Sequence, residues 1–303
     1  SAVLRLGQRH PWTARRMKFG VIPPYGISPL ESGDFAVAFA QMAERYGFES
    51  IWVVEHVVMA VDYVSVYPYD PSGRSPFTAD VQQPDPLIWL SYIAAATQRI
   101  RLATGILNLP QRNPLILAKE VASLDRLSGG RLELGIGIGW VREEAAAVGT
   151  SFDNRGRRTD EYIEVMRTLW REPVASFKGE FVNFERVVSQ PKPAQADGVP
   201  IVVGGHSKAA ARRAGRLGDG FYPLGVSAAK LAALRDTMAE SARQCGRDPS
   251  VIAITCLGNP DLQSAEFYAG VGVDRMVIAA KHRDLEELRR WCGTFSHDVM
   301  GRI

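Results

Sequence analysis

The amino-acid sequence predicts an α/β fold, a single (β/α)8 TIM barrel over residues 17–303. Three observations lead to this fold class. The chain has 303 residues, of which 46% are hydrophobic and 23% charged, so it can bury one large core. Short apolar runs alternate with amphipathic segments of helical spacing through eight successive units. No linker divides the chain, which favours one barrel over two smaller α/β domains.

The first half of the chain supplies four of these units. The expected strands are 19–22, 50–54, 100–104 and 132–138, and the expected helices are 32–46, 87–96, 113–129 and 157–170. The third helix is the most clearly bounded, because Asn113 can cap it, Pro114 suits its first turn and Gly129 can end it. The fourth strand is almost continuously apolar, which is typical of a strand buried on both faces of a parallel sheet.

The second half supplies four further units and one interruption. The expected strands are 200–203, 220–222, 251–257 and 275–280, and the expected helices are 208–217, 228–242, 263–269 and 284–291. An excursion hairpin is expected at 174–188, around Gly179. After the second strand, residues 57–85 contain several prolines and the aromatic residues Tyr63, Tyr67 and Tyr69 but no periodic pattern. A loop of this length commonly serves as a lid, and the aromatic side chains favour that role.

Composition limits the classes of partner. Lys and Arg number 36 and Asp and Glu 33, and the resulting net charge of +3 is too small for a dedicated nucleic-acid-binding protein. No uncharged apolar run reaches the roughly 18 residues that cross a bilayer. The three cysteines have no paired spacing, which indicates neither a disulfide framework nor a metal site. We therefore expect a cytoplasmic protein that acts on a small molecule, with residues 1–16 as an N-terminal extension.

The carboxyl ends of the strands are where a TIM barrel carries its reactive groups. The second strand ends in Glu55 and His56, which are the candidate catalytic residues. An imidazole titrates near neutral pH, so His56 can act as an acid or base, or donate a hydrogen bond to a bound ring. The alternative is a structural histidine whose hydrogen bonds are satisfied by the loop.

The third strand ends in Thr104 and Gly105, with Asn108 shortly after. Glycine lets the backbone approach a flat ligand closely, and the two polar side chains offer the hydrogen bonds that a heterocycle edge needs. A glycine required only for the turn is the alternative. Arg112 follows and can either meet an anion or remain solvated at the surface.

Alternate glycines mark the fourth strand, where Gly135, Gly137 and Gly139 precede Trp140. The run does not fit the dinucleotide-binding fingerprint, because Trp140 stands where the last glycine is required. We expect these glycines to create room inside the barrel, with Gly139 and Trp140 against a flat aromatic ligand. A Trp140 that is simply a core residue is the alternative.

The fifth strand ends in Gly204, Gly205, His206 and Ser207, directly before a helix. Two glycines can turn their N–H groups inward, the serine can cap the helix, and the helix N-terminus is partly positive. The turn is therefore a candidate phosphate site. An ordinary tight turn is the alternative.

Other catalytic motifs are missing from the sequence. There is no nucleophile elbow, Walker loop or zinc-protease motif. Two pairs of adjacent carboxylates, Glu143 with Glu144 and Asp160 with Glu161, point in different directions on a helix and are expected on the solvated surface.

Four segments together resemble the bacterial luciferase-like superfamily, and within it the probable F-420-dependent oxidoreductase subgroup. They are RIRLATGILNLPQRNPL at 99–115, ASLDRLSGGRLELGIGIGW at 122–140, GGHS at 204–207 and RLGDG at 216–220. The pair Glu55-His56 also looks like the second-strand ending of that family. The segments are spread over most of the chain, and in combination they are specific.

The resemblance implies a (β/α)8 barrel that binds FMN or the deazaflavin coenzyme F-420 without covalent attachment, and a homodimer. It places a non-proline cis peptide at Gly105-Ile106 against the cofactor ring, His56 near the reactive ring, and the phosphate at residues 204–207. The chain departs from the sugar-phosphate dehydrogenase branch of the family, which has a glutamate where Trp140 stands here.

Three functions follow from this resemblance and these residues. The first is hydride transfer between coenzyme F-420 and an unknown small organic substrate, with His56 as acid or base. The second is an FMN-dependent monooxygenase that uses molecular oxygen. The third is a cofactor carrier without catalysis.

Overall fold

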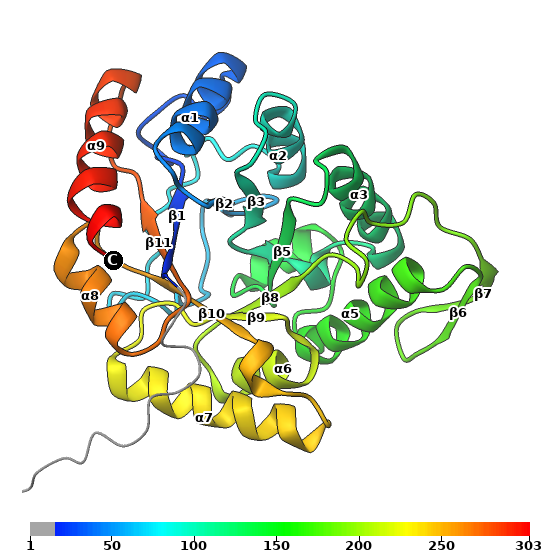
Figure 1. Ribbon diagram of the computed structural model, residues 1–303. Coiled ribbons are helices and arrows are strands. Elements are labelled where there is room, and N and C mark those ends of the chain that lie inside the picture. The colour runs from blue at the N-terminus through cyan, green and yellow to red at the C-terminus, as the bar shows by residue number, and fades with distance from the viewer. Residues whose placement is uncertain (1–15) are drawn as a thin grey trace, which may run out of the picture.

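A closed barrel of parallel strands forms the centre of the molecule, and the predicted TIM barrel is confirmed (Figure 1). The structure is a computed structural model that describes residues 16–303. In order around the barrel, the strands are β1 (Lys18–Ile22), β2 (Ser50–Val53), β3 (Arg101–Thr104), β5 (Leu132–Gly137), β8 (Ile201–Gly204), β9 (Gly220–Tyr222), β10 (Ala253–Leu257) and β11 (Arg275–Ala279). The barrel closes where β1 pairs with β11, from Lys18 opposite Arg275 to Ile22 opposite Ala279.

Helices surround this barrel as an outer ring (Figure 1). They are α1 (Gly33–Arg45), α2 (Pro86–Ala94), α3 (Pro114–Leu127), α5 (Arg155–Arg171), α6 (Lys208–Leu217), α7 (Ala228–Gln244), α8 (Leu262–Gly270) and α9 (Leu285–Asp298). The short helix α4 (Arg142–Ala147) follows the carboxyl end of β5. The caps expected for the third predicted helix are present, since Asn113 accepts hydrogen bonds from the amides of Leu115 and Ile116 and Pro114 is the first residue of α3. Gly129, just past its end, has a positive φ of 72°.

The expected excursions are also present. β6 (Ala175–Lys178) and β7 (Asn183–Val187) form the predicted antiparallel hairpin. Residues 54–85, between β2 and α2, contain no helix or strand, as expected for a long loop. We call residues 57–85 the lid. Residues 1–15 of the expected N-terminal extension lie outside the described part of the chain, and Arg16 donates a hydrogen bond to the carbonyl of Met300.

Three elements differ from the sequence prediction. The last helix was expected to end at residue 291 but continues to Asp298, because Phe295 packs on Phe19 and Phe48 with ring centroids 5.6 and 5.8 Å apart. The short helix α4 was not predicted, and neither was β4 (Leu107–Asn108), which pairs with β5 beyond the end of β3. Both lie at the carboxyl ends of the strands, where the candidate site residues are.

The opposite end of the barrel is filled by a buried ionic cluster. Arg275, the first residue of β11, donates hydrogen bonds of 2.8 to 3.0 Å to both oxygens of Glu49 and both oxygens of Glu133. Its guanidinium also lies 5.2 Å from the ring of Trp52. Arg101 reaches Glu133 from β3. The cluster ties together the starts of β2, β3, β5 and β11 and leaves the other end of the barrel to carry the site.

No helix in residues 16–303 combines the length and the apolar composition that a membrane crossing requires.

Replacement of Arg275 by Met should lower the free energy of unfolding by about 3–5 kcal/mol, because Glu49 and Glu133 lose the buried cation that bridges them and only Lys18 and Arg101 remain nearby. Urea unfolding at neutral pH measures the loss. As a control, Arg290→Met removes an exposed partner of Glu286 on α9 and should change stability by no more than about 0.5 kcal/mol. Equal effects of the two substitutions would contradict the structural role of the cluster.

The pH dependence of stability should contain a contribution from Glu49. Burial alone would raise the pKa of Glu49, but the charge of Arg275 outweighs this and holds the pKa at about 2. Because the folded-state pKa lies below the ordinary value, the stabilisation is present above about pH 4.5 and is lost as the pH falls toward about 2. Glu49→Gln should therefore unfold with a shallower pH dependence in that window.

Urea unfolding between neutral and acid pH measures this slope. Glu240→Gln, which alters an exposed carboxylate on α7, should keep the slope of the unmodified protein. An unchanged slope in Glu49→Gln would contradict the assigned pKa direction.

Candidate active site

The predicted site residues follow four strands that are neighbours in the barrel. β2 pairs with β3, β3 with β5, and β5 with β8, so their carboxyl ends form one continuous arc of the barrel mouth. Figure 1 shows β2, β3, β5 and β8 along this side of the barrel. The residues expected to bind a cofactor and those expected to act on a substrate therefore share one face.

Glu55 lies at the mouth but is fully engaged by other parts of the chain. One carboxylate oxygen accepts a 2.5 Å hydrogen bond from the backbone amide of Asn108, and the other accepts from Arg112, whose guanidinium also contacts Asp85. Burial raises the pKa of Glu55, and the nearby Arg112 opposes that rise. Of the two possibilities considered for Arg112, an anion partner or a solvated position, the structure shows an anion partner, the carboxylate of Glu55. Each of these two charged groups is thus occupied by the other.

His56 contacts a carboxylate that the sequence analysis did not propose. Its Nδ1 lies 3.0 Å from Oε2 of Glu144, and the other oxygen of Glu144 accepts a 2.6 Å hydrogen bond from the amide of Val57. Glu144 is fully buried, so the expectation that it lies on the solvated surface is wrong. A sequence signal was available, because Val141, Glu144 and Ala145 have the spacing of one helical face and all three are buried.

The neighbouring carboxylate fixes the lid. Glu143 accepts hydrogen bonds from the amide of Val64 at 2.7 Å and from the hydroxyl of Ser65 at 2.6 Å. The second pair of adjacent carboxylates is engaged as well: Asp160 binds arginines of α6, and Glu161 accepts backbone amides of the hairpin. These three carboxylates are partly exposed, as a surface position implies, but each has a fixed partner that is distant in sequence.

The segment after β3 crosses over the glycines of β5. The Gly105–Ile106 peptide is cis, as the resemblance implies. A Cβ on Gly137 would overlap the side chain of Ile106, and a Cβ on Gly204 would lie 2.7 Å from its Cγ2. At Gly135 a Cβ would overlap the carbonyl oxygen of residue 104. The glycines do create room inside the barrel, as expected, but the chain itself fills most of it.

Thr104 is likewise committed to the protein, since its hydroxyl donates a 2.6 Å hydrogen bond to the carbonyl of Gly135. Gly139, by contrast, is open: a Cβ there would come no closer than 3.6 Å to the side-chain amides of Asn108 and Gln111. Gly139 has a positive φ of 76°.

Besides the side-chain amide of Gln83 in the lid, two buried amide oxygens lack a hydrogen-bond partner within residues 16–303. One is Oε1 of Gln111, beside Gly139. The other is Oδ1 of Asn154, which precedes Arg155, the residue that donates a 3.2 Å hydrogen bond to the carbonyl of Gly139. Buried acceptors without a donor are costly, so this region suits a ligand that brings N–H groups. Gln111 and Asn154 were not proposed from the sequence.

The lid lies against Trp140. The rings of Tyr63 and Tyr67 contact Trp140 edge to face with centroids 5.6 and 5.2 Å apart, and the ring of His56 does so at 6.0 Å. Trp140 is only partly buried, so it belongs to the mouth and not to the core. The lid continues from Tyr67 to Tyr69, whose ring is 4.8 Å from that of His206. A continuous row of rings therefore joins the ends of β2, β5 and β8.

The turn after β8 matches its expected shape, with one correction. Gly205 has a φ of 117°, but its N–H donates to the carbonyl of Tyr222 at 3.1 Å and does not point inward for a phosphate. Ser207 caps α6 by accepting from the amide of Ala210, which leaves its own hydroxyl proton free to donate. His206 Nδ1 is buried without a partner among the described residues.

The pKa of the His206 imidazole in this turn depends on the groups around it. Burial lowers the pKa of His206, and the positive charge of Lys230 lowers it further. An anion at the turn would oppose both effects, because it stabilises the charged form of the imidazole. The buried Nδ1 without a partner is therefore the observation that fits the phosphate-bearing group implied by the resemblance.

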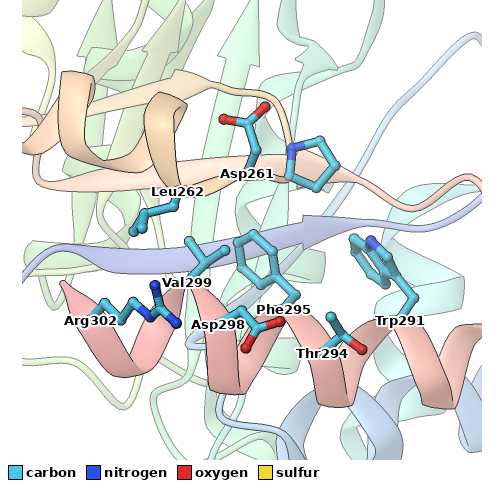
Figure 2. A pocket seen from close by; sticks show the side chains of 9 residues that line it. Asp261, Leu262, Trp291, Thr294, Phe295, Asp298, Val299 and Arg302 are labelled. Carbon is cyan, nitrogen blue, oxygen red and sulfur yellow. The ribbon is translucent and has the colours of Figure 1, made fainter.

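A separate pocket of about 430 Å³ lies elsewhere on the molecule (Figure 2). Figure 2 shows Asp261 and Leu262, at the start of α8, on one side and Trp291, Phe295 and Val299 on the other. None of the site residues predicted from the sequence lines this pocket. Asp261 is already used as the cap of α8, so the pocket is a gap between two outer helices.

Comparison with known proteins gives a family match and several relatives. Residues 17–284 match the family described as luciferase-like monooxygenase. An F-420-dependent glucose-6-phosphate dehydrogenase of Kineococcus radiotolerans is 30% identical over 277 residues, which are 87% of this chain and 75% of that protein. An FMNH2-dependent dimethylsulfone monooxygenase of Pseudomonas putida is 30% identical over 198 residues, 64% of this chain and 49% of that protein.

An uncharacterized protein of Mycobacterium tuberculosis is 36% identical over 182 residues, and the match covers 59% of this chain and 64% of that relative. Among solved structures, a monooxygenase of Streptomyces bottropensis superposes with a TM-score of 0.74 at 23% identity, over 94% of this chain and 99% of that one. An F-420-dependent secondary alcohol dehydrogenase superposes with a TM-score of 0.72 at 19% identity, over 94% and 98%. These structural likenesses support the fold.

Replacement of Gly135 by Ala should destabilise the protein by about 1–3 kcal/mol or more, because the new methyl group meets a backbone carbonyl that cannot move aside. Thermal unfolding measures the change. Gly270→Ala is the matched control, since a Cβ there meets nothing within 4 Å. A Gly135→Ala protein as stable as the control would contradict the close contact between β5 and the end of β3.

Proposed function

Because the chain belongs to the luciferase-like monooxygenase family, we propose that it is an oxidoreductase that binds coenzyme F-420 and acts on a small organic substrate at the barrel mouth. The observation that carries this proposal is the arc of strand ends that joins His56, the open face of Gly139 and the unpaired Nδ1 of His206. The F-420-dependent relative supports the choice of cofactor, since its match extends over 277 residues against 198 for the FMN-dependent one.

Different residues of the arc would bind different parts of the cofactor. His206 and the hydroxyl of Ser207 would hold the phosphate, where Gly204 and Gly205 keep the turn free of side chains. At the other end of the arc, Asn108 and Gln111 beside Gly139 would bind the polar edge of the cofactor ring system. The walls of this part of the site would be formed by Thr104, Gly105, Ile106 and Trp140.

The proposed reaction combines the chemistry of the cofactor with proton transfer by side chains of this protein. When bound, coenzyme F-420 supplies hydride transfer. His56 would take or give the accompanying proton at Nε2, which has no hydrogen-bond partner among residues 16–303. Glu55 was a candidate catalytic residue, but both of its oxygens are occupied, so we propose that it positions Asn108 and Arg112. The lid would exclude water from the mouth.

Two other functions remain as alternatives. An FMN-dependent monooxygenase is favoured by the dimethylsulfone monooxygenase relative. A cofactor carrier would use the same turn without catalysis, and any multiple turnover would exclude it. A homodimer is proposed from the resemblance, and it is supported by the exposed apolar residues Ile88 and Ile116 on the neighbouring helices α2 and α3.

Titration of the purified protein with F-420 and with FMN tests the proposed cofactor. We expect binding of F-420 in preference to FMN, followed by fluorescence or absorbance. Ser207→Ala should weaken F-420 binding by about 10- to 150-fold, because one charge-assisted hydrogen bond is worth roughly 1.5–3 kcal/mol. Tight binding of FMN without measurable affinity for F-420 would overturn the proposal in favour of the monooxygenase.

Ser32→Ala provides the matched control for the phosphate turn. Ser32 caps α1 by accepting from the amide of Phe35, as Ser207 caps α6. Both substitutions should cost about 1 kcal/mol of stability through the lost cap, but only Ser207→Ala should weaken cofactor binding. Equal cofactor affinity in the two variants would remove Ser207 from the proposed site.

A further inference from the structure

A buried carboxylate beside His56 has no role in the function proposed so far. Glu144 is 0% exposed, lies on the short helix α4 and comes from a part of the chain 88 residues distant from His56. A buried carboxylate is costly unless hydrogen bonds or a partner charge compensate it. Within residues 16–303 it has two hydrogen-bond partners, the imidazole of His56 and the backbone amide of Val57.

These two contacts determine which ring nitrogen of His56 carries the proton. An ionised carboxylate only accepts hydrogen bonds, so the 3.0 Å contact from Nδ1 to Oε2 requires Nδ1–H. In the neutral imidazole the other nitrogen, Nε2, must then have the free lone pair. The second oxygen of Glu144 holds Val57, the next residue along the chain, and so fixes the backbone on which His56 is carried.

We propose that Glu144 is a positioning residue that holds His56 as the Nδ1–H tautomer and thereby reserves Nε2 as the proton acceptor toward a bound substrate. The catalytic part of this inference rests on the proposed function, whereas the tautomer is a property of the protein alone. Trp140 adds a second constraint, because its ring meets the imidazole edge to face and limits rotation of the side chain.

Glu144→Gln should reverse the tautomer. The new amide has one carbonyl oxygen, which must serve the amide of Val57 because a backbone N–H cannot change its role. The NH2 group then faces Nδ1, and the imidazole can accept its hydrogen bond only by moving its own proton to Nε2. Nε2 would thus become a donor and lose the lone pair that the proposed proton transfer needs.

Nitrogen-15 NMR of histidine side chains in the full-length protein, recorded above neutral pH without cofactor, tests the inference. His56→Gln identifies the His56 signals among the five histidines of the chain by their loss. We expect Nδ1 protonated in the unmodified protein and Nε2 protonated in Glu144→Gln. Glu143→Gln is the matched control, because among the described residues the hydrogen bonds of this carboxylate go to Val64 and Ser65 and not to His56 or Val57, and it should leave the His56 tautomer unchanged.

Two results would overturn the positioning role. One is an Nε2–H tautomer in the unmodified protein, which needs no variant to be seen. The other is an Nδ1–H tautomer that persists in Glu144→Gln. Because no cofactor is present, failure of F-420 to bind leaves this measurement unaffected, so a wrong cofactor and a wrong role for Glu144 give different outcomes.

Discussion

The close approach of the segment after β3 to strands β5 and β8 is the constraint on which the barrel mouth depends. Gly135, Gly137 and Gly204 lack the side chains that would otherwise occupy this space, and Ile106 together with the carbonyl of residue 104 fills it. Because the segment after β3 can cross over β5 at these glycines, the amide of Asn108 lies within hydrogen-bond distance of Glu55, and Gln111 lies beside Gly139. The arrangement of the polar groups thus follows from a packing condition.

The negative charges of the two buried carboxylates at the barrel mouth, Glu55 and Glu144, are compensated in the same way. Glu55 and Glu144 each use one oxygen for a backbone amide and the other for a side chain, which is Arg112 for Glu55 and His56 for Glu144. The backbone amide belongs in each case to a segment that bears candidate site residues, Asn108 itself and His56 beside Val57. Each carboxylate therefore fixes loop backbone and orients one basic group, and the low polarity of the site strengthens both contacts.

Periodicity and turn chemistry predicted the fold well, because strands, helices and caps are encoded by neighbouring residues. The glycine and polar residues at four strand ends could be placed on one face for the same reason. The ion pairs of the site could not be predicted, since the partners of His56 and Arg112 lie 88 and 57 residues away. Glu144 shows the limit clearly: it was expected on the solvated surface although its helical spacing fits a buried face, and only the folded barrel reveals which group compensates it.

The tethering of the lid has a consequence for protein engineering. Its hydrogen bonds to α4 run from Val57 to the carboxylate of Glu144 and from Val64 and Ser65 to that of Glu143, and the amide of Arg142 donates back to the hydroxyl oxygen of Ser65. The lid also packs its rings on Trp140 and His206. The ionic cluster of Arg275, which secures the barrel, lies at the opposite end. A loop that keeps a serine at position 65 and a backbone amide at position 57 could therefore be grafted onto this barrel as a module, because its anchoring groups on α4 would remain and the ionic cluster that supports the barrel would not be touched.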